Sequence, residues 1–192
     1  MTAQRAFVVA SSAGGLNALL VLLPSLPAGF PAPVVCVQHM HPHQPSLLAD
    51  ILARRCAVPV RFAAEGQVLE PGVVLVAPPD RHTVIDEGAR IRLWDGPLVN
   101  HVRPSADLLF SSAAAVLGPR TVAVVLSGTG HDGAAGAAAV REAGGTVVVQ
   151  APPNCEFPGM VESTMRLVEP DAMLPVGEIG AAFQRLAAEA VA

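Results

Sequence analysis

The sequence predicts an α/β protein built on a doubly wound, mostly parallel sheet with helices on both faces and a short antiparallel hairpin. Short apolar runs alternate with longer helical patterns along the chain, as in successive βαβ units. Hydrophobic residues make up 52% of the chain and charged residues only 15%, which suits strands that are covered on both faces. The length of 192 residues predicts a single domain that spans residues 1–192.

Two strand–helix units are predicted in the first part of the chain. The apolar run at residues 6–10 is interpreted as a buried strand, which ends at the small residues 11–15. A helical pattern follows to residue 26. A second buried strand at residues 33–37 leads into a turn rich in His and Pro and then into a helix near residues 46–55.

The middle of the chain, residues 58–94, predicts several short strands, because short runs with period-2 character are separated by turn residues. One pair is expected to form a hairpin across Asp86, Glu87 and Gly88. A helix is predicted at residues 104–117, with Pro104 in its first turn.

The last part of the chain returns to the βαβ pattern. Residues 121–126 predict a third buried strand, which ends in a glycine-rich turn and leads into a helix at 132–143. A further strand is predicted at 146–150, and an amphipathic helix at 178–192 is expected to close the fold.

Two residue types are missing from the sequence, and their absence narrows the chemistry. The 12 Lys and Arg residues are all Arg, which excludes a P-loop lysine, a Schiff-base lysine and a Ser-Lys pair. Tyr is also absent, so proton transfer is expected to fall to His, Asp or Glu. A formal net charge of -4 and few aromatic residues argue against a nucleic-acid partner.

The three cysteines indicate a reducing compartment. They are odd in number and widely spaced, with neither metal-finger spacing nor a disulfide framework. The N-terminus carries no signal-peptide pattern, and no apolar run is long enough to span a bilayer. We therefore expect a cytoplasmic protein that does not insert into a membrane.

Polar side chains follow three of the predicted strands at the point where each strand ends. Ser12 follows the first strand, His39 the second and Asp132 the third. In open α/β sheets the loops beyond the carboxyl ends of the strands converge on the functional site. Serine, imidazole and carboxylate are the parts of an activated serine nucleophile, and free N–H groups at the start of the following helix suit an oxyanion.

The serine has alternative interpretations. Ser11 or Ser12 is also suited to cap the following helix, and the glycine turn after them is suited to cradle a phosphate. The spacing alone does not choose between the two serines.

The histidine and the aspartate have alternatives too. In an extended segment, the side chains of His39, His41 and His43 would lie on one face and could bind a metal ion. Pro42 and Pro45 disfavour a regular strand there. No metal is therefore expected. Asp132 is suited to cap a helix. Gly128, Gly130 and Gly133 beside it have the spacing of a nucleotide-binding fingerprint. The acidic residue that this fingerprint needs about twenty positions later is missing.

The chain resembles the catalytic domain of the chemotaxis protein-glutamate methylesterases (CheB type). The resemblance runs from about residue 6 to residue 166 and is specific because five motifs recur in the same order. They are ASSAGG at 10–15, VQHM at 37–40, VAPPDRH at 76–82, VRPSADLLF at 102–110 and LSGTGHDGA at 126–134.

The resemblance selects Ser12 over Ser11 as nucleophile and implies that His39 and Asp132 complete a catalytic triad. It implies hydrolysis of glutamyl γ-methyl esters on a methylated chemoreceptor or a similar signalling protein, together with deamidation of glutamine. The implied route is an acyl-enzyme without a metal or an organic cofactor. A hydrolase of a different ester, a non-catalytic binding module and a nucleotide-binding protein are the alternatives.

The chain departs from the family pattern at three places. It starts at the first strand of the catalytic domain, so we expect it to lack the receiver domain that controls family members. Ala13 stands where Thr is common, and residues 157–161 read FPGMV where the family usually has FGMP. Arg103 is expected to pair with Asp107 at i+4, or to hold an acidic segment of the receptor.

Overall fold

The computed structural model describes residues 4–189 and places a seven-stranded sheet at the centre of the molecule. The strand order is β3-β4-β2-β1-β7-β8-β9, and every neighbouring pair is parallel. The strands are β1 (Ala6–Ser11), β2 (Val34–Gln38), β3 (Val60–Phe62), β4 (Val74–Val76), β7 (Thr121–Val125), β8 (Thr146–Gln150) and β9 (Ala172–Leu174).

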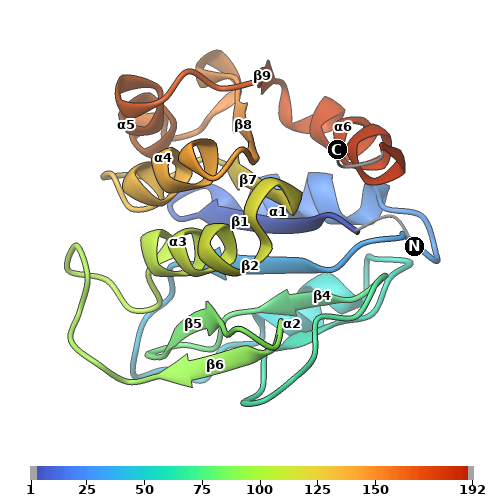
Figure 1. Cartoon of the computed structure of the whole chain (residues 1–192). Coiled ribbons are helices and arrows are strands. Elements are labelled where there is room, and N and C mark those ends of the chain that lie inside the picture. The colour runs from blue at the N-terminus through green and yellow to red at the C-terminus, as the bar shows by residue number, and fades with distance from the viewer. Residues whose placement is uncertain (1–3, 190–192) are drawn as a thin grey trace.

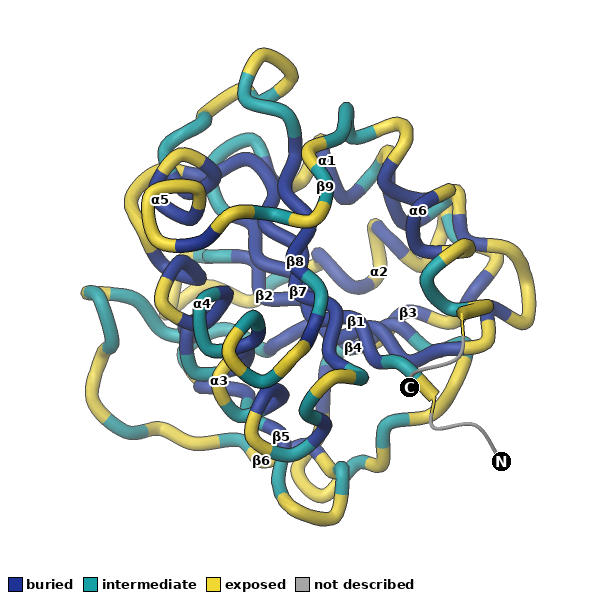
Figure 2. The backbone as a smooth tube through the Cα atoms, turned by 45° about the horizontal axis from the view of Figure 1, so that its top comes forward, coloured by how far each residue is buried: buried dark blue, intermediate teal, exposed yellow. Residues whose placement is uncertain are grey.

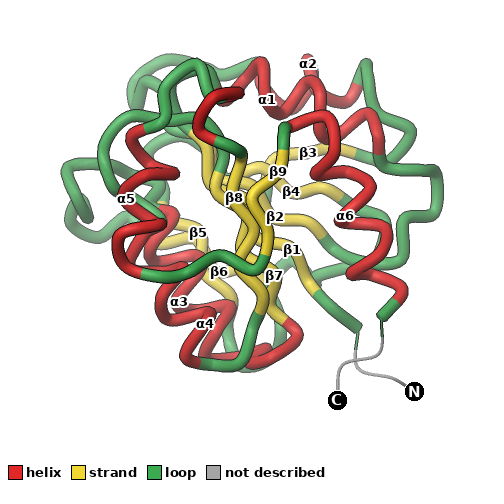
Figure 3. Tube along the Cα trace, turned by 90° about the horizontal axis from the view of Figure 1, so that it is seen from above, coloured by secondary structure: helices red, strands yellow, loops and turns green. Residues whose placement is uncertain are grey.

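Helices cover both faces of the sheet, which forms the middle layer in Figure 3. One face carries α1 (Gly15–Leu22), α2 (Leu48–Ala53) and α6 (Val176–Ala188). The other carries α3 (Ala106–Leu117), α4 (Ala134–Glu142) and α5 (Gly159–Leu167), with α3 and α4 in front of the strands in Figure 1. The predicted fold class is confirmed. Within residues 4–189, no helix is both long and apolar enough to cross a membrane.

Side chains alternate between the two faces of the central strands and so supply two separate cores. Val8 and Ala10 of β1 belong to the core under α3 and α4, whereas Phe7 and Val9 belong to the core under α1 and α6. Figure 2 shows this buried central sheet inside exposed loops. Phe7 stacks on Phe183 of α6 with ring centroids 4.3 Å apart.

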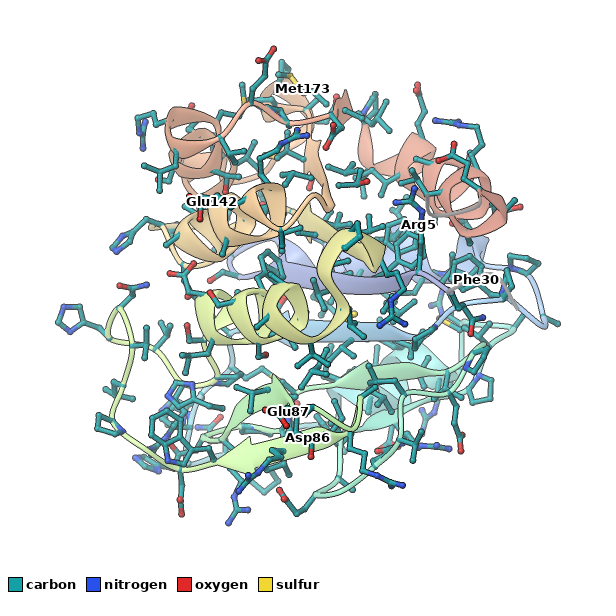
Figure 4. All side chains as sticks on the ribbon, viewed as in Figure 1. Arg5, Phe30, Asp86, Glu87, Glu142 and Met173 are labelled. Carbon is teal, nitrogen blue, oxygen red and sulfur yellow. The ribbon has the colours of Figure 1, made fainter. Side chains whose placement is uncertain are left out.

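The predicted hairpin is present beside the main sheet. β5 (His82–Ile85) and β6 (Ile91–Trp94) pair antiparallel, with Ile85 opposite Ile91. Figure 4 labels Asp86 and Glu87 at the turn between the two strands. The Asp86 carboxylate accepts hydrogen bonds from the N–H groups of Gly88 and Arg90, which fixes the turn locally.

Three details differ from the sequence expectations. Pro104 lies before helix α3 and outside its first turn, because Ser105 takes the N-cap position and the helix begins at Ala106. Helix α5 and the edge strand β9 were not expected. β9 has only three residues, and α5 begins directly after Pro158 with Gly159, two residue types that favour turns. The closing helix runs from Val176 to Ala188, and residues 190–192 of the predicted helix lie outside the described residues.

We predict that Phe183→Ala lowers the free energy of unfolding by about 3–5 kcal/mol, because it leaves a cavity in a close-packed core. Phe183 is 0% exposed and packs against Phe7 and Phe30. Urea unfolding followed by circular dichroism measures the change. The control is Leu167→Ala, whose side chain is 61% exposed and whose loss is expected to cost at most about 0.5 kcal/mol. Equal losses would contradict this account of the core.

Candidate active site

The candidate site lies beyond the carboxyl ends of three adjacent strands. In the sheet, β1 stands between β2 and β7, and the chain leaves β1 and β7 toward helices on opposite faces. The loops after these two strands therefore separate and leave a crevice, which is the usual position of a site in a doubly wound sheet. Ser12 follows β1, His39 follows β2 and Asp132 lies in the loop after β7.

Ser12 is held by the turn that joins β1 to α1. Its backbone N–H donates to the Ser127 carbonyl at 3.0 Å, and its own carbonyl accepts from the Gly15 N–H at 2.8 Å. The turn requires Gly14, whose φ of 73° lies in the left-handed region that other residues seldom adopt. The result is a half-buried serine at the entry to a helix.

His39 connects the serine to the aspartate. Its Nδ1 lies 3.1 Å from Ser12 Oγ, and its Nε2 lies 2.8 Å from Asp132 Oδ2. The ring therefore presents Nδ1 to the serine and Nε2 to the aspartate, whereas in the chymotrypsin-type triad Nε2 faces the serine. The reason is strand order: the near nitrogen of the ring meets the adjacent strand β1, and the distal nitrogen reaches β7, one strand farther.

Asp132 is buried and accepts four hydrogen bonds. Besides His39, the Ala106 N–H donates to Oδ2 at 2.6 Å, while the Ser105 hydroxyl and the Asp107 N–H donate to Oδ1 at 2.7 and 3.1 Å. Burial alone would raise the pKa of Asp132, but the hydrogen bonds from His39 and from these groups hold its pKa below the ordinary value. The group is therefore a carboxylate, which fixes the Nε2–H tautomer of His39 and leaves Nδ1 free to accept the serine proton.

Asp132 also serves as the N-terminal cap of helix α3, from outside that helix. Asp107, in the first turn of α3, does the reverse: its Oδ1 accepts from the N–H groups of Gly133 and Gly136 at the start of α4. Each aspartate thus satisfies the free N–H groups of the other's helix. Burial raises the pKa of Asp107, and the nearby Asp132 adds to this effect.

Two residues that support this arrangement were missed in the sequence analysis. Ser105 is fully buried, and its N–H donates to Nδ1 of the buried His82, whose Nε2 donates to the Pro97 carbonyl. Asp107 was considered only as a partner of Arg103. Ser105 and Asp107 could have been found from their position, because both stand at the start of a predicted helix, where capping residues are common.

Arg103 does not pair with Asp107, which corrects the sequence expectation. Its guanidinium donates to Asp80 Oδ1 at 2.6 and 2.9 Å and to the carbonyls of Asp95 and Gly96. The loop before α3 turns away from the helix, so Arg103 and Asp107 do not follow helical i, i+4 spacing. Arg103 fastens the loop at 95–103 to the segment that precedes β5.

Two hollows lie near His39, and both have mainly apolar walls. A pocket of about 340 Å³ is lined by His39 itself, and a neighbouring groove of about 430 Å³ is lined by Gln38 and Met40 on either side of it in the chain. Met40 lines both hollows. The pocket also includes His39, Pro42, His43, Asp80, Leu98, His101, Val102 and Arg103, and the groove includes Leu16, Gln38, His41, Gln44, Pro45, Ser46, Leu47, Leu48 and Ile51.

The three neighbouring histidines do not form a ligand set. His39 is engaged with Ser12 and Asp132, whereas His41 and His43 are exposed and meet edge to face with ring centroids 6.0 Å apart. In the part of the chain that the structure describes, no group of three or more His, Cys, Asp or Glu residues is arranged to hold a metal ion.

Comparisons with known proteins point to one family. A family model described as CheB methylesterase matches residues 7–183. The protein-glutamate methylesterase/protein-glutamine glutaminase 2 of Oleidesulfovibrio alaskensis is 38% identical over 183 residues, which are 94% of this chain and 51% of that protein. A relative from Anaeromyxobacter dehalogenans with the same name is 41% identical over 179 residues, or 93% of this chain and 52% of that protein. The chain thus spans about half the length of these curated relatives.

A solved structure agrees with these relatives. The crystal structure of the Thermotoga maritima CheB methylesterase catalytic domain matches with a TM-score of 0.92 and 34% sequence identity. The match covers 95% of this chain and 98% of that one.

We predict that Asp107→Ala lowers the free energy of unfolding by about 1–3 kcal/mol, because the N–H groups of Gly133 and Gly136 lose a buried acceptor. Asp107→Asn keeps an acceptor oxygen and is expected to cost less, since Asn100 can turn its amide to match. Urea unfolding at pH 7 compares the two variants. Equal losses would show that Asp107 does not act as a cap.

The wild-type chain and Asp107→Asn are also expected to differ in how their stability depends on pH. Folding raises the pKa of Asp107, so the folded state binds more protons there than the unfolded state, and ionisation of this group weakens the fold. The ionised Asp107 therefore lowers the free energy of unfolding at pH values above its folded pKa. This loss disappears as the pH falls toward about 4, the ordinary pKa of Asp. The wild-type chain should therefore gain stability relative to Asp107→Asn as the pH is lowered. A constant difference across that range would contradict the raised pKa.

Proposed function

This chain belongs to the CheB methylesterase family, and we propose that it is a serine esterase that removes methyl groups from glutamyl γ-methyl esters. Ser12 is the proposed nucleophile, His39 the general base and Asp132 the residue that orients the imidazole. The observation that carries the proposal is the unbroken hydrogen-bonded chain from Ser12 Oγ through both nitrogens of His39 to the Asp132 carboxylate.

In the proposed mechanism, His39 Nδ1 takes the hydroxyl proton as Ser12 Oγ attacks the ester carbonyl. The resulting imidazolium donates its Nε2–H to the ionised Asp132 and is stabilised by it. Collapse of the tetrahedral intermediate expels methanol, which receives the proton from Nδ1, and leaves an acyl-enzyme. Water, deprotonated by the same nitrogen, then releases the glutamate and restores Ser12.

The developing oxyanion is proposed to lie at the start of helix α1. Among hydrogen bonds within residues 4–189, the Ala13 and Gly14 N–H groups have no acceptor, and both directly follow the nucleophile. Backbone N–H groups that are fixed before the reaction stabilise the negative charge without reorganisation. The short turn therefore supplies both the nucleophile and the donors for its transition state.

The substrate is proposed to be a methylated chemoreceptor or a similar signalling protein in the cytoplasm. The curated relatives are named both protein-glutamate methylesterases and protein-glutamine glutaminases, which supports two related reactions. The same residues serve both, because attack on a glutamine side chain gives the same acyl-enzyme and releases ammonia in place of methanol. The pocket and the groove near His39, both mainly apolar, are suited to the polypeptide around the modified side chain.

We predict that Ser12→Ala abolishes labelling by a fluorophosphonate probe and lowers ester turnover at least about 10³-fold, while the fold is retained. A small ester surrogate or a methylated receptor serves as substrate. The control is Ser25→Ala, because the exposed Ser25 donates its hydroxyl to the Leu22 carbonyl and makes no bond to any residue of the site. Undiminished hydrolysis by Ser12→Ala would overturn the assignment. Absence of labelling in the wild-type chain would favour a binding module.

We predict that Asp132→Asn lowers kcat by about 10²- to 10⁴-fold, because an amide no longer stabilises the imidazolium or fixes its tautomer. The KM value is expected to change much less, since Asp132 is buried behind His39. Steady-state kinetics on the same ester separates the two constants. A loss confined to KM would contradict the proposed role.

A further inference from the structure

Gln38, the last residue of β2, fills the space between the nucleophile and the base. Its side chain is almost completely buried, at 8% exposure, and all of its polar atoms are engaged. The Nε2 group donates to the Ser12 carbonyl at 2.9 Å and to the His39 carbonyl at 3.0 Å. The Oε1 atom accepts from the Ser11 hydroxyl at 2.8 Å, which fixes which end of the amide points toward the two carbonyls.

These bonds continue the sheet past its last backbone pair. The parallel ladder between β1 and β2 ends at Ser11 and Gln38, with a final bond from the His39 N–H to the Ser11 carbonyl. Beyond this point the two chains leave for different helices, so backbone pairing no longer sets the distance between Ser12 and His39. The Gln38 amide replaces the missing pairing with a direct bridge from one carbonyl to the other.

The neighbouring backbone is shaped to admit this amide. A Cβ at Gly15 would overlap Gln38 Oε1 and would also come too close to the Ser11 side chain. Glycine at this position therefore allows the helix α1 to start directly against the buried amide. The packing leaves Gln38 one orientation, and that orientation places both donors on the residues of the proposed triad.

We propose that Gln38 is a positioning residue of this esterase, which sets the separation between Ser12 Oγ and His39 Nδ1 through their backbones. This inference rests on the proposed function. Gln38 touches neither substrate nor reacting atoms, so its effect is on the alignment of the nucleophile with its base. A small misplacement of such groups is costly, because a shift of about 1 Å lowers rates by about 10²-fold.

The test compares Gln38→Met with Gln38→Glu. Gln38→Met keeps the length of the side chain and removes both donors, and we expect kcat to fall about 10- to 100-fold with KM within about threefold. The matched control is Thr121→Val. Thr121 is also a buried polar side chain on a parallel strand, but it opens β7 at the end of the sheet away from the site, and its hydroxyl donates to the Ala113 carbonyl. This control is expected to lose stability and to keep kcat within about twofold.

Gln38→Glu supplies a readout that a purely structural role would not move, and it decides the matter if Gln38→Met fails to fold. The ionised carboxylate of this variant faces two carbonyl oxygens and lacks a donor, but a protonated carboxyl regains one. The ratio of its kcat to the wild-type kcat should therefore rise as the pH is lowered. A ratio that stays constant while both proteins remain folded would overturn the positioning role.

The wild-type measurement separates the two proposals. An active wild-type chain with unchanged kcat in Gln38→Met would overturn the role of Gln38 alone and leave the esterase proposal standing. A wild-type chain that neither hydrolyses the ester nor reacts with the fluorophosphonate would overturn both.

Discussion

The buried carboxylate of Asp132 is the interaction on which the rest of the site depends. It accepts hydrogen bonds from His39, from the Ser105 hydroxyl and from two backbone N–H groups at the start of α3. A buried charge is tolerated only when it is fully paired, and here a helix terminus and an imidazole share that task. Three of these four bonds, from Ser105, Ala106 and Asp107, also fix helix α3 against the loop after β7, so the geometry of the site and the packing of the helix depend on the same carboxylate.

The pairing is reciprocal, and this explains the second buried carboxylate. Asp107 caps α4 while Asp132 caps α3, and each lies near the other's negative charge. Burial raises the pKa of Asp107, and repulsion from Asp132 adds a smaller effect in the same direction. Burial also acts to raise the pKa of Asp132, but the hydrogen bonds from His39 and from the start of α3 outweigh it and lower that pKa.

Most of the fold was predictable because its central strands are short, apolar and separated by helical patterns. The strands at β1, β2, β7 and β8 and the hairpin at Asp86 were predicted close to their observed bounds. Strand β9 was missed because three residues are too few to show a period, and helix α5 because Pro158 and Gly159 at its start favour a turn. Strand-end position led to the residues that the structure brings together, Ser12, His39 and Asp132, and their catalytic role stays a proposal.

The sequence by itself determined the sheet class, the strand ends that carry polar side chains, and the family resemblance that selected Ser12 over Ser11. These are local properties, set by apolar periodicity and by turn residues next to each other in the chain. Only the tertiary structure decided which imidazole nitrogen faces Ser12, that Arg103 pairs with Asp80, and that Gln38 bridges the two strand ends. Each of these depends on the order of strands in the sheet and on side chains distant in sequence, which no local pattern encodes.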